Sequence, residues 1–326
     1  MKETGPLNAI LEIKGLKAYY ETIKGYVKAV DDVSLRIKSK TAVGLVGESG
    51  CGKTTLALAV TRLLPSNGRV LGGSIFFNGK DILSISEEEF RKEYRWKKIS
   101  MVFQGAMNAL NPVYRIGDQI AEAIIRHENV SKDEALERAK KLLSLVGIDP
   151  KRAKSYPHEL SGGMKQRTMI AMALACNPEF LIADEPTTAL DVIVQAQVLK
   201  LIKSLQQELG LTLMLITHDL SVVAEICDYA AVMYAGKLVE SADIVTIYKN
   251  PLHPYTKGLV NAFPSIRGEK KQLVSIPGAP PNLLNPPSGC RFHPRCPYAM
   301  EICRREEPEL VKVDGDHQVA CHLVSR

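Results

Sequence analysis

Residues 47–54 read Gly-Glu-Ser-Gly-Cys-Gly-Lys-Thr, a spacing of glycines before a lysine and a hydroxyl that is typical of a phosphate-binding loop. The glycines let backbone N–H groups point inward at an anion, and the helix expected to follow adds the positive end of its dipole. Lys53 can reach the β- and γ-phosphates of a nucleotide, and the Thr54 hydroxyl can bind Mg²⁺. The alternative is a glycine-rich turn without a ligand. The expected phosphate contacts are Gly47, Glu48, Ser49, Gly50, Cys51, Gly52, Lys53, Thr54 and Thr55.

A second group of candidate residues follows two short apolar segments. Asp184 and Glu185 come directly after residues 180–183, and His218 comes after residues 211–217. In open α/β sheets, ligands lie at the carboxyl ends of the strands. Asp184 is therefore expected to hold Mg²⁺ through water, and Glu185 to polarise an attacking water as a general base. His218 could contact the γ-phosphate and hold that water in line. A turn and a structural histidine are the alternative interpretations.

Residues 160–167 (LSGGMKQR) predict another anion site at the start of a helix. Ser161 is a good N-cap for the apolar-rich helical segment 163–176. A serine followed by Gly162 and Gly163 also leaves backbone N–H groups open to an anion. A capped core helix is the alternative. Two phosphate-binding helix starts in one chain require an explanation.

The elements that must position these residues alternate between strand and helix. Short apolar runs at 41–46, 180–183 and 211–216 are typical of strands covered on both faces. Segments with helical periodicity, 54–64 and 190–209, follow two of them, and Gly210 is a plausible helix stop. This alternation predicts an α/β core with a largely parallel sheet. Residues 115–160 contain no strand-like run and predict a helical insertion.

The overall composition is that of a globular protein. The chain has 326 residues, of which 45% are hydrophobic and 24% charged, so disorder, a collagen-like fold and a coiled coil are excluded as the main architecture. No apolar run reaches the roughly 18 residues needed to span a membrane. Residues 1–7 lack the apolar core of a signal peptide, so a cytoplasmic location is expected. The net charge of +6 favours polyphosphate binding over a nucleic-acid surface, and the basic stretch 91–98 is interpreted as a solvated helix face.

The composition changes near residue 250. Four of the seven cysteines and most of the 18 prolines lie beyond that point. This number of prolines excludes long helices and central strands. The tail is therefore expected to need a stabilising cross-link. Cys51 is interpreted as a small filler, and Cys176 and Cys227 as core residues.

The order of these motifs resembles that of ATP-binding subunits of ABC transporters. The matching segments are GESGCGKT at 47–54, Gln104 in MVFQ, LSGGMKQR at 160–167, LIADEPT at 181–187, Asp191 after Ala189-Leu190, and His218 in ITHD. The resemblance implies an α/β, P-loop (RecA-like) ABC nucleotide-binding domain over residues 1–240 with a helical subdomain at about 105–165. A small Pro/Cys-rich C-terminal domain would occupy residues 241–326.

The resemblance also implies roles for individual residues. Two such domains dimerise head to tail, so Ser161, Gly162 and Gly163 of one would contact the γ-phosphate held by the other. This accounts for two anion sites in one chain. Gln104 is implied as a ligand of Mg²⁺ and as the link from the nucleotide to the helical insertion. Asp191 is implied at the dimer seam. Tyr20 matches the aromatic that stacks on adenine, with Tyr19 the alternative, and the implied catalytic residues are Lys53, Gln104, Glu185 and His218.

Three further segments resemble the dipeptide/oligopeptide importer ATPases: residues 108–112 (NALNP), 250–256 (NPLHPYT) and 288–303 (SGCRFHPRCPYAMEIC). This implies an ATPase that powers peptide import from the cytoplasmic face of the membrane. Its partners would be a second ATPase subunit in a heterodimer, two permeases and an extracytoplasmic peptide-binding protein, and no nucleic acid. Nickel and oligosaccharide importers share the subfamily. A soluble non-transport ABC ATPase and a P-loop kinase are rivals of other classes.

The four tail cysteines, Cys290, Cys296, Cys303 and Cys321, allow three interpretations. Disulfides are disfavoured in the cytoplasm, and structural zinc usually has tighter cysteine pairs. Four more widely spaced thiolates, one followed by proline, suit an iron–sulfur cluster. The subfamily resemblance also indicates [4Fe–4S], with zinc and unligated thiols as alternatives. The nearby substitutes for a missing ligand are His293, His317 and His322.

Overall fold

The computed structural model describes residues 9–105, 108–262 and 276–324, so residues 1–7, on which the expectation about a signal peptide rests, lie outside the described residues. The chain divides into two compact units, residues 1–83 with 216–326 and residues 84–215, and each is described by itself. These two units are the parts of the chain whose residues pack mainly among themselves. The division into a nucleotide-binding domain at 1–240 and a C-terminal domain at 241–326 remains a prediction.

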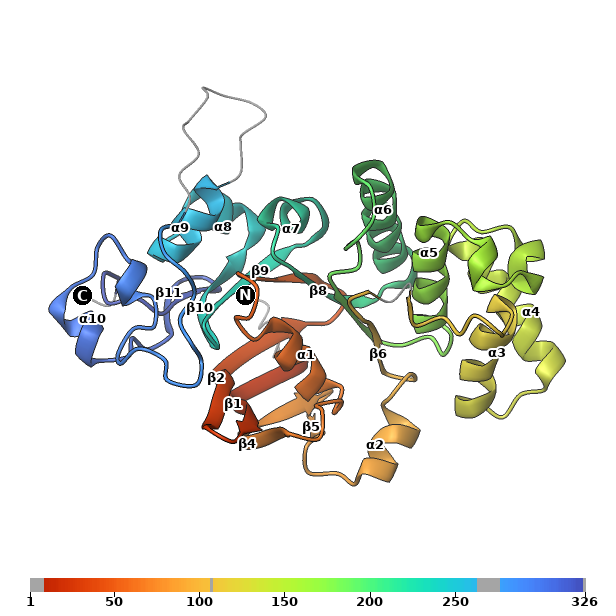
Figure 1. Cartoon of the computed structure of the whole chain (residues 1–326), viewed down its shortest axis with the longest axis horizontal. Helices are drawn as coiled ribbons and strands as arrows, with labels where there is room; N and C mark the ends of the chain where they lie inside the picture. Colours follow the sequence, from red (N-terminus) through yellow and green to blue (C-terminus); the bar gives the residue numbers. More distant parts are fainter. Residues whose placement is uncertain (1–8, 106–107, 263–275, 325–326) are drawn as a thin grey trace, which may run out of the picture. The chain divides into compact units, whose positions relative to one another are not determined.

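The first unit contains an antiparallel sheet of four strands in the order β2-β1-β4-β5 (Figure 1). Its strands are β1 (Ala9–Thr22), β2 (Gly25–Lys38), β4 (Gly68–Phe77) and β5 (Lys80–Asp81). In β2, Val33, Leu35 and Ile37 are buried, while Ser34 and Arg36 between them are exposed. The alternation of apolar and polar residues over 33–38 thus puts one face of this part of β2 in the core and leaves the other face accessible. The other strands of this sheet were not predicted, because register shifts and glycines interrupt their patterns.

A second set of strands in the first unit follows the order β11-β12-β10-β9-β3. These are β3 (Ala42–Val46), β9 (Tyr229–Tyr234), β10 (Lys237–Asp243), β11 (Val311–Asp314) and β12 (His317–Val319). The β3–β9 pair is parallel and the others are antiparallel, so this part of the sheet is less parallel than predicted. A Cβ on Gly44 of β3 would lie 2.2 Å from Val223 Cγ1, which shows how closely α7 (Leu220–Ile226) covers the strand.

The remaining helices of the first unit are short. They are α1 (Lys53–Val60), α8 (Ile244–Lys249), α9 (Pro254–Asn261), the 3₁₀ turn η4 (His293–Arg295) and α10 (Glu301–Arg305). The helix predicted at 54–64 is wrong at its end, because α1 stops at Val60 and Arg62 has a left-handed backbone (φ 54°). Where the structure describes the proline-rich tail, its helices and strands are all short, as expected.

Buried Glu240 ties the tail to strand β10. Its side chain is 0% exposed and accepts hydrogen bonds from the Leu252 N–H at 2.7 Å and the His253 N–H at 3.0 Å. Its Oε1 also lies 2.8 Å from His317 Nε2 on β12. A buried carboxylate of this kind is stable only with its partners in place.

The second unit joins parallel strands to a group of helices. The strands β6 (Ile99–Val102), β7 (Phe180–Asp184) and β8 (Thr212–Thr217) are neighbours in that order, and β8 runs past the end of the unit at Leu215. Every residue of β7 is buried, which confirms a strand covered on both faces. The helices are α2 (Glu87–Glu93), α3 (Ile116–His127), α4 (Lys132–Leu145), α5 (Gly162–Ala173) and α6 (Val192–Leu209), with 3₁₀ turns η2 (Pro150–Lys154) and η3 (Pro157–Glu159).

The predicted helical insertion is confirmed by α3 and α4, which pack against each other and against α5. The buried residues Ile116, Ile120 and Ile124 recur at helical spacing along α3. Gly210 ends α6 in a left-handed conformation (φ 62°), as expected for a helix stop. In the described ranges, no helix is long and apolar enough to cross a membrane. The fold is thus α/β, as predicted.

We predict that Glu240→Ala lowers the free energy of unfolding by about 3 kcal/mol, since it leaves buried donors without their acceptor. Urea unfolding of the whole chain measures the change. The matched control is Glu208→Ala on the exposed last turn of α6, expected to change stability by less than about 0.5 kcal/mol. Equal losses in both variants would contradict this account of the tail.

Candidate active site

The phosphate-binding loop joins the end of β3 at Val46 to the start of α1 at Lys53, the strand–loop–helix context predicted for it. Gly52 has φ 104°, and a Cβ there would lie 1.9 Å from the Ala29 carbonyl oxygen. A Cβ on Gly47 would lie 2.1 Å from the Met233 carbonyl oxygen. Side chains are therefore excluded behind the loop, and its backbone can turn its N–H groups toward a ligand.

Lys53 lies folded over this loop. Its Nζ donates to the Gly47 and Glu48 carbonyl oxygens at 2.7 and 3.0 Å, and the residue is only 5% exposed. The ammonium is thus held beside the N–H groups that would bind a phosphate. Thr54 is exposed at the start of α1, where its hydroxyl could bind Mg²⁺. Burial raises the pKa of the Cys51 thiol, so this residue is a neutral filler at pH 7.

Two tyrosines near the loop are fixed differently. The Tyr20 hydroxyl lies 3.0 Å from Thr55 Oγ1, which places its ring beside the first turn of α1. Tyr19 instead donates to Asp31 Oδ1 at 2.5 Å. Burial would raise the pKa of Asp31, but this hydrogen bond and the cations Lys237 and Arg291 outweigh burial and lower the pKa. The geometry therefore favours Tyr20 as the residue next to a nucleotide.

Two side chains of the tail also form hydrogen bonds with Glu48 of the phosphate-binding loop. Arg295 Nη1 and Nη2 donate to the two carboxylate oxygens of Glu48 at 2.6 and 2.9 Å. The Glu48 carboxylate holds the pKa of Arg295 above its usual range, and the arginine side chain is 6% exposed. The Glu48 N–H donates to the buried Tyr255 hydroxyl at 2.8 Å. Sequence reasoning missed Arg295 and Tyr255, because nothing in their spacing shows a contact with a segment some 200 residues away.

His218 follows β8 and is exposed. The next residue, Asp219, accepts from the Ser221 N–H at 2.8 Å and begins α7. His218 therefore stands in the loop between a strand end and a helix start.

In the second unit, Gln104 and Glu185 meet at the ends of neighbouring strands. Gln104 Nε2 donates to Glu185 Oε2 at 2.8 Å, and the Thr188 hydroxyl donates to the same oxygen at 3.1 Å. The parallel register Val102↔Ala183 brings the two segments to one edge. Glu185 has a left-handed backbone (φ 43°), an uncommon conformation that is found at functional sites. Asp184, the last residue of β7, is 1% exposed.

The other predicted residues of the second unit lie at helix starts. Ser161 caps α5 by accepting from the Met164 N–H at 3.3 Å, and Asp191 caps α6 by accepting from the Val194 N–H at 3.0 Å. Gly162 is exposed, and a Cβ on Gly163 would lie 2.6 Å from Val194 Cγ1. A small residue is thus needed where α5 begins beside α6.

The four tail cysteines are near one another but do not form a metal site as placed. The pKa of Cys290 is raised to about 11. Burial is the main cause, and the nearby thiols of Cys303, Cys321 and Cys296 act in the same direction. Across residues 9–105, 108–262 and 276–324, no group of three or more His, Cys, Asp or Glu side chains is placed to hold a metal ion. The predicted metal centre is therefore not confirmed.

Each histidine named as a substitute ligand has one ring nitrogen in a polar contact, so its role as a ligand stays a prediction. His293 Nδ1 lies 2.9 Å from the Cys290 carbonyl oxygen, and His322 Nε2 lies 2.9 Å from the Glu306 carbonyl oxygen. His317 contacts buried Glu240. Cys176 and Cys227 are buried, as expected of core residues.

Comparisons with protein families give two matches along the chain. Residues 30–188 match the family described as ABC transporter. Residues 239–303 match the family described as Oligopeptide/dipeptide transporter, C-terminal region.

Three curated relatives are similar over most of the chain. The dipeptide transport ATP-binding protein DppD of Caldanaerobacter subterraneus subsp. tengcongensis is 46% identical over 97% of this chain and 98% of its own. The oligopeptide transport ATP-binding protein OppD of Escherichia coli is 49% identical over 92% and 89%, respectively. The oligopeptide transport ATP-binding protein AppD of Bacillus subtilis is 47% identical over 97% of each chain.

Two solved structures share the fold at 28% identity and a TM-score of 0.64. The dimeric bacterial ABC transporter cassette MJ0796 covers 72% of this chain and 98% of its own. The cbiO1 protein of Clostridium perfringens, part of the transporter complex cbiONQ, covers 74% and 92%.

We predict that Arg295→Gln weakens ATP binding by about 5- to 30-fold, because a charge-assisted pair that orders the loop contributes about 1–2 kcal/mol. Titration calorimetry with ATP in excess EDTA measures the dissociation constant. The control is Arg304→Gln, an exposed arginine on α10. A dissociation constant that stays within twofold of the native value would show that the tail does not order the loop.

Proposed function

Because this chain belongs to the ABC transporter family and is similar along its length to dipeptide and oligopeptide transport ATP-binding proteins, we propose that it is the ATP-hydrolysing subunit of a peptide importer. The observation that carries the proposal is the match over both the nucleotide-binding part and the tail, residues 239–303. The tail match favours peptide importers over a soluble ABC ATPase or a P-loop kinase.

ATP binding is assigned to the loop and to Tyr20. The phosphates would take the loop N–H groups and Lys53, which would exchange its present carbonyl acceptors for phosphate oxygens. Thr54, Gln104 and Asp184 would hold Mg²⁺, whose charge would offset that of the phosphates. Exposure of Thr54 and Gln104 and the position of Asp184 at the end of β7 support this set.

Hydrolysis is assigned to Glu185 and His218. Glu185 would accept a proton from the attacking water as the bond from the γ-phosphorus to the bridging oxygen breaks, and His218 would hold that water in line. The hydrogen bonds from Gln104 and Thr188 to Glu185 Oε2 support a fixed position for this base. The bond between Gln104 and Glu185 also means that a displacement of Glu185 would move Gln104, and through it the segment that leads to the next helices.

A second ATPase subunit would complete the site from outside the chain. Ser161, Gly162, Gly163 and Asp191 would face the nucleotide of the partner. Exposed apolar side chains next to Asp191 support a covered surface there, since Val192 is 80% and Ile193 73% exposed. The partner is proposed to be a different ATPase subunit.

The permease contact is assigned to a basic cleft in the second unit. The cleft has a volume of about 740 Å³, and its cations include Arg91, Lys92 and Lys97. Trp96, at its edge, has a left-handed backbone (φ 72°) and stacks on His127 at 6.0 Å. The basic stretch 91–98 is therefore not simply a helix face, because α2 ends at Glu93.

Burial and the cations led by Lys97 lower the pKa of His127, so its ring is neutral at pH 7 and the positive charge of the cleft comes from lysine and arginine. An acidic cytoplasmic segment of a permease would fit it. The proposed assembly has two permeases and an extracytoplasmic peptide-binding protein, with this chain at the cytoplasmic face of the membrane.

A [4Fe–4S] cluster on Cys290, Cys296, Cys303 and Cys321 is the remaining part of the proposal. Its support is the gathering of four thiols in one proline-rich segment, where Cys296, Cys303 and Cys321 are all close enough to Cys290 to act on it electrostatically. The thiols would have to lose their protons and draw closer to bind it. The cluster would cross-link the tail that carries Arg295.

We predict that Glu185→Gln leaves the affinity for ATP within about twofold of the native value and lowers turnover at least about 100-fold, since the amide cannot accept the proton. Phosphate release by the assembled transporter measures turnover. The control is Glu179→Gln, at the other end of β7, which should hydrolyse ATP normally. Native turnover in Glu185→Gln would overturn the assigned base.

Anaerobically purified protein is expected to contain about four irons and four sulfides per chain, and Cys296→Ser is expected to lose them. Metal and sulfide analysis with an absorption spectrum measures both, and Cys176→Ser, in the core, is the control. Without the cluster, Cys290, with a pKa near 11, should react slowly with iodoacetamide at pH 7 and faster as the pH rises. One zinc or no metal in the native protein would contradict the cluster.

A further inference from the structure

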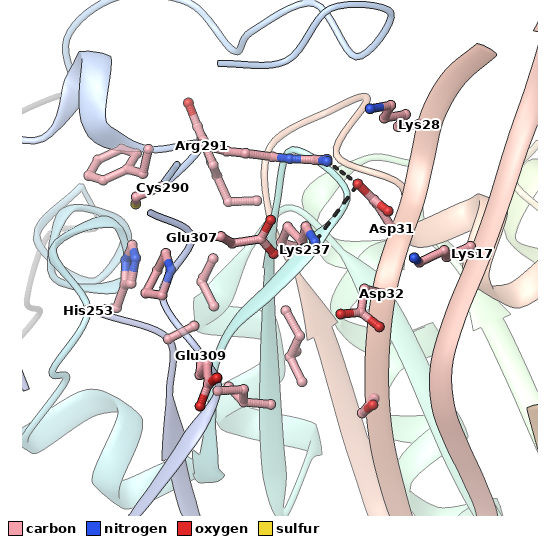
Figure 2. A pocket seen from close by; sticks show the side chains of 18 of the residues that line it. Lys17, Lys28, Asp31, Asp32, Lys237, His253, Cys290, Arg291, Glu307 and Glu309 are labelled. Atoms are coloured by element: carbon pink, nitrogen blue, oxygen red, sulfur yellow. Dashed lines mark hydrogen bonds and ion pairs between the residues drawn. The ribbon is translucent and has the colours of Figure 1, made fainter. Parts of the chain in front are cut away.

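A cavity of about 620 Å³ opens between the N-terminal strands and the tail of the first unit (Figure 2). One wall comes from β1 and β2, a second from the segment where β10 begins, and the third from the tail. Its volume is in the range of small-molecule sites. Its charged lining residues are Lys17, Lys28, Asp31, Asp32, Lys237, Arg291, Glu307 and Glu309.

Some of these charges neutralise one another at the back of the cavity. Arg291 donates to Asp31, and Lys237 pairs with Glu307 and lies 3.8 Å from Asp31 (Figure 2). This network joins the tail to strand β2. The other charged side chains of the lining are left to contact a ligand or water.

Four charged side chains of the lining have no such partner. In the part of the chain that the structure describes, no hydrogen bond or ion pair joins the side chains of Lys17, Lys28, Asp32 or Glu309 to another residue. Lys17 and Lys28 come from the paired strands β1 and β2, while Glu309 comes from the tail on the other side (Figure 2). The strands therefore offer two cations and the Asp32 carboxylate, and the tail offers a second carboxylate, so the unpaired charges of the lining suit a ligand with one charge of each sign.

Apolar side chains line the space between these charges. Leu238 and Val239 of β10 belong to the lining, together with Phe292 and Leu310 of the tail. Such a surface suits a small side chain or methyl group held between two charged ends. A simple anion or a simple cation would use only half of this lining.

We propose that this cavity binds a short zwitterionic peptide, with the peptide carboxylate beside Lys17 and Lys28 and its ammonium beside Glu309. The choice of a peptide as the zwitterion rests on the proposed function, since import delivers such molecules to the side of the membrane where ATP is bound. The site is separate from the phosphate-binding loop, and it shares Cys290 with the group of four tail cysteines.

The cavity is connected to the phosphate-binding loop by consecutive hydrogen bonds. Arg291 donates to the Asp31 carboxylate, the Asp31 N–H donates to the Gly236 carbonyl at 2.8 Å, and the Gly236 N–H donates to the Cys51 carbonyl at 2.9 Å. Lys28, in the cavity wall, directly precedes Ala29, whose carbonyl oxygen packs behind Gly52. A bound peptide thus has a route to affect nucleotide affinity, and by linkage ATP would affect peptide affinity by the same factor.

Calorimetric titration of the full chain with dialanine tests the proposal. A dissociation constant on the order of 1 mM or tighter is expected for a ligand of this size. N-acetyl-dialanine and dialanine amide, which each lack one charge, should bind at least about tenfold more weakly. No binding at about 10 mM dialanine, or equal binding of the blocked peptides, would overturn it.

Variants locate the binding. Lys28→Gln and Glu309→Gln should each weaken dialanine binding at least about tenfold, because each removes one charged contact. The matched controls are Lys24→Gln, in the β1–β2 turn, and Glu306→Gln, in the tail, which are exposed and outside the lining. Controls that lose as much affinity as the cavity variants would place the peptide elsewhere and overturn the assignment.

Phosphate release, measured in parallel, separates this inference from the proposed function. A chain that hydrolyses ATP in its transporter but does not bind dialanine overturns the inference alone. A chain that binds dialanine in the cavity but never hydrolyses ATP supports the inference and overturns the proposed function.

Discussion

The phosphate-binding loop depends on the absence of side chains behind it. The Ala29 carbonyl of β2 and the Met233 carbonyl of β9 stand where a Cβ of Gly52 or Gly47 would be. The neighbouring strands, rather than the loop itself, therefore hold its backbone in shape. Arg295 and Tyr255 complete this support through Glu48, and Arg295 does so from 247 residues further along the chain. The tail thus belongs to the nucleotide site as much as α1 does.

In the second unit, too, neighbouring strands position the functional side chains. Parallel pairing of β6 with β7 brings Gln104 and Glu185 to one edge, and the bond between them fixes a carboxylate whose backbone is already in an uncommon conformation. A base must be held in place before it can act on one water molecule. The exposed Val192 and Ile193 beside Asp191 give this unit a surface that a second ATPase subunit would cover.

Local sequence patterns predicted the elements that depend on interactions between residues close together in the chain. The loop 47–54, the buried strand β7, the helical insertion and the glycine stop at Gly210 follow from spacing, apolar runs and backbone freedom. The sequence did not reveal the antiparallel sheet around β1, because bulges and glycines break its alternation. Nor did it reveal the contact of Arg295 with Glu48, since side-chain pairing over such a separation leaves no periodic trace. Cysteine count suggested a metal centre, but the thiols as placed are gathered without converging.

The central claim is that ATP hydrolysed by this chain drives peptide import, and reconstitution tests it most directly. The chain would be assembled with its partner ATPase and permeases in proteoliposomes, with the peptide-binding protein and a labelled dipeptide on the opposite side from ATP. We expect dipeptide accumulation that requires ATP and Mg²⁺, proceeds with phosphate release and stops when ADP replaces ATP. Phosphate release without ATP-dependent accumulation of peptide would contradict the account.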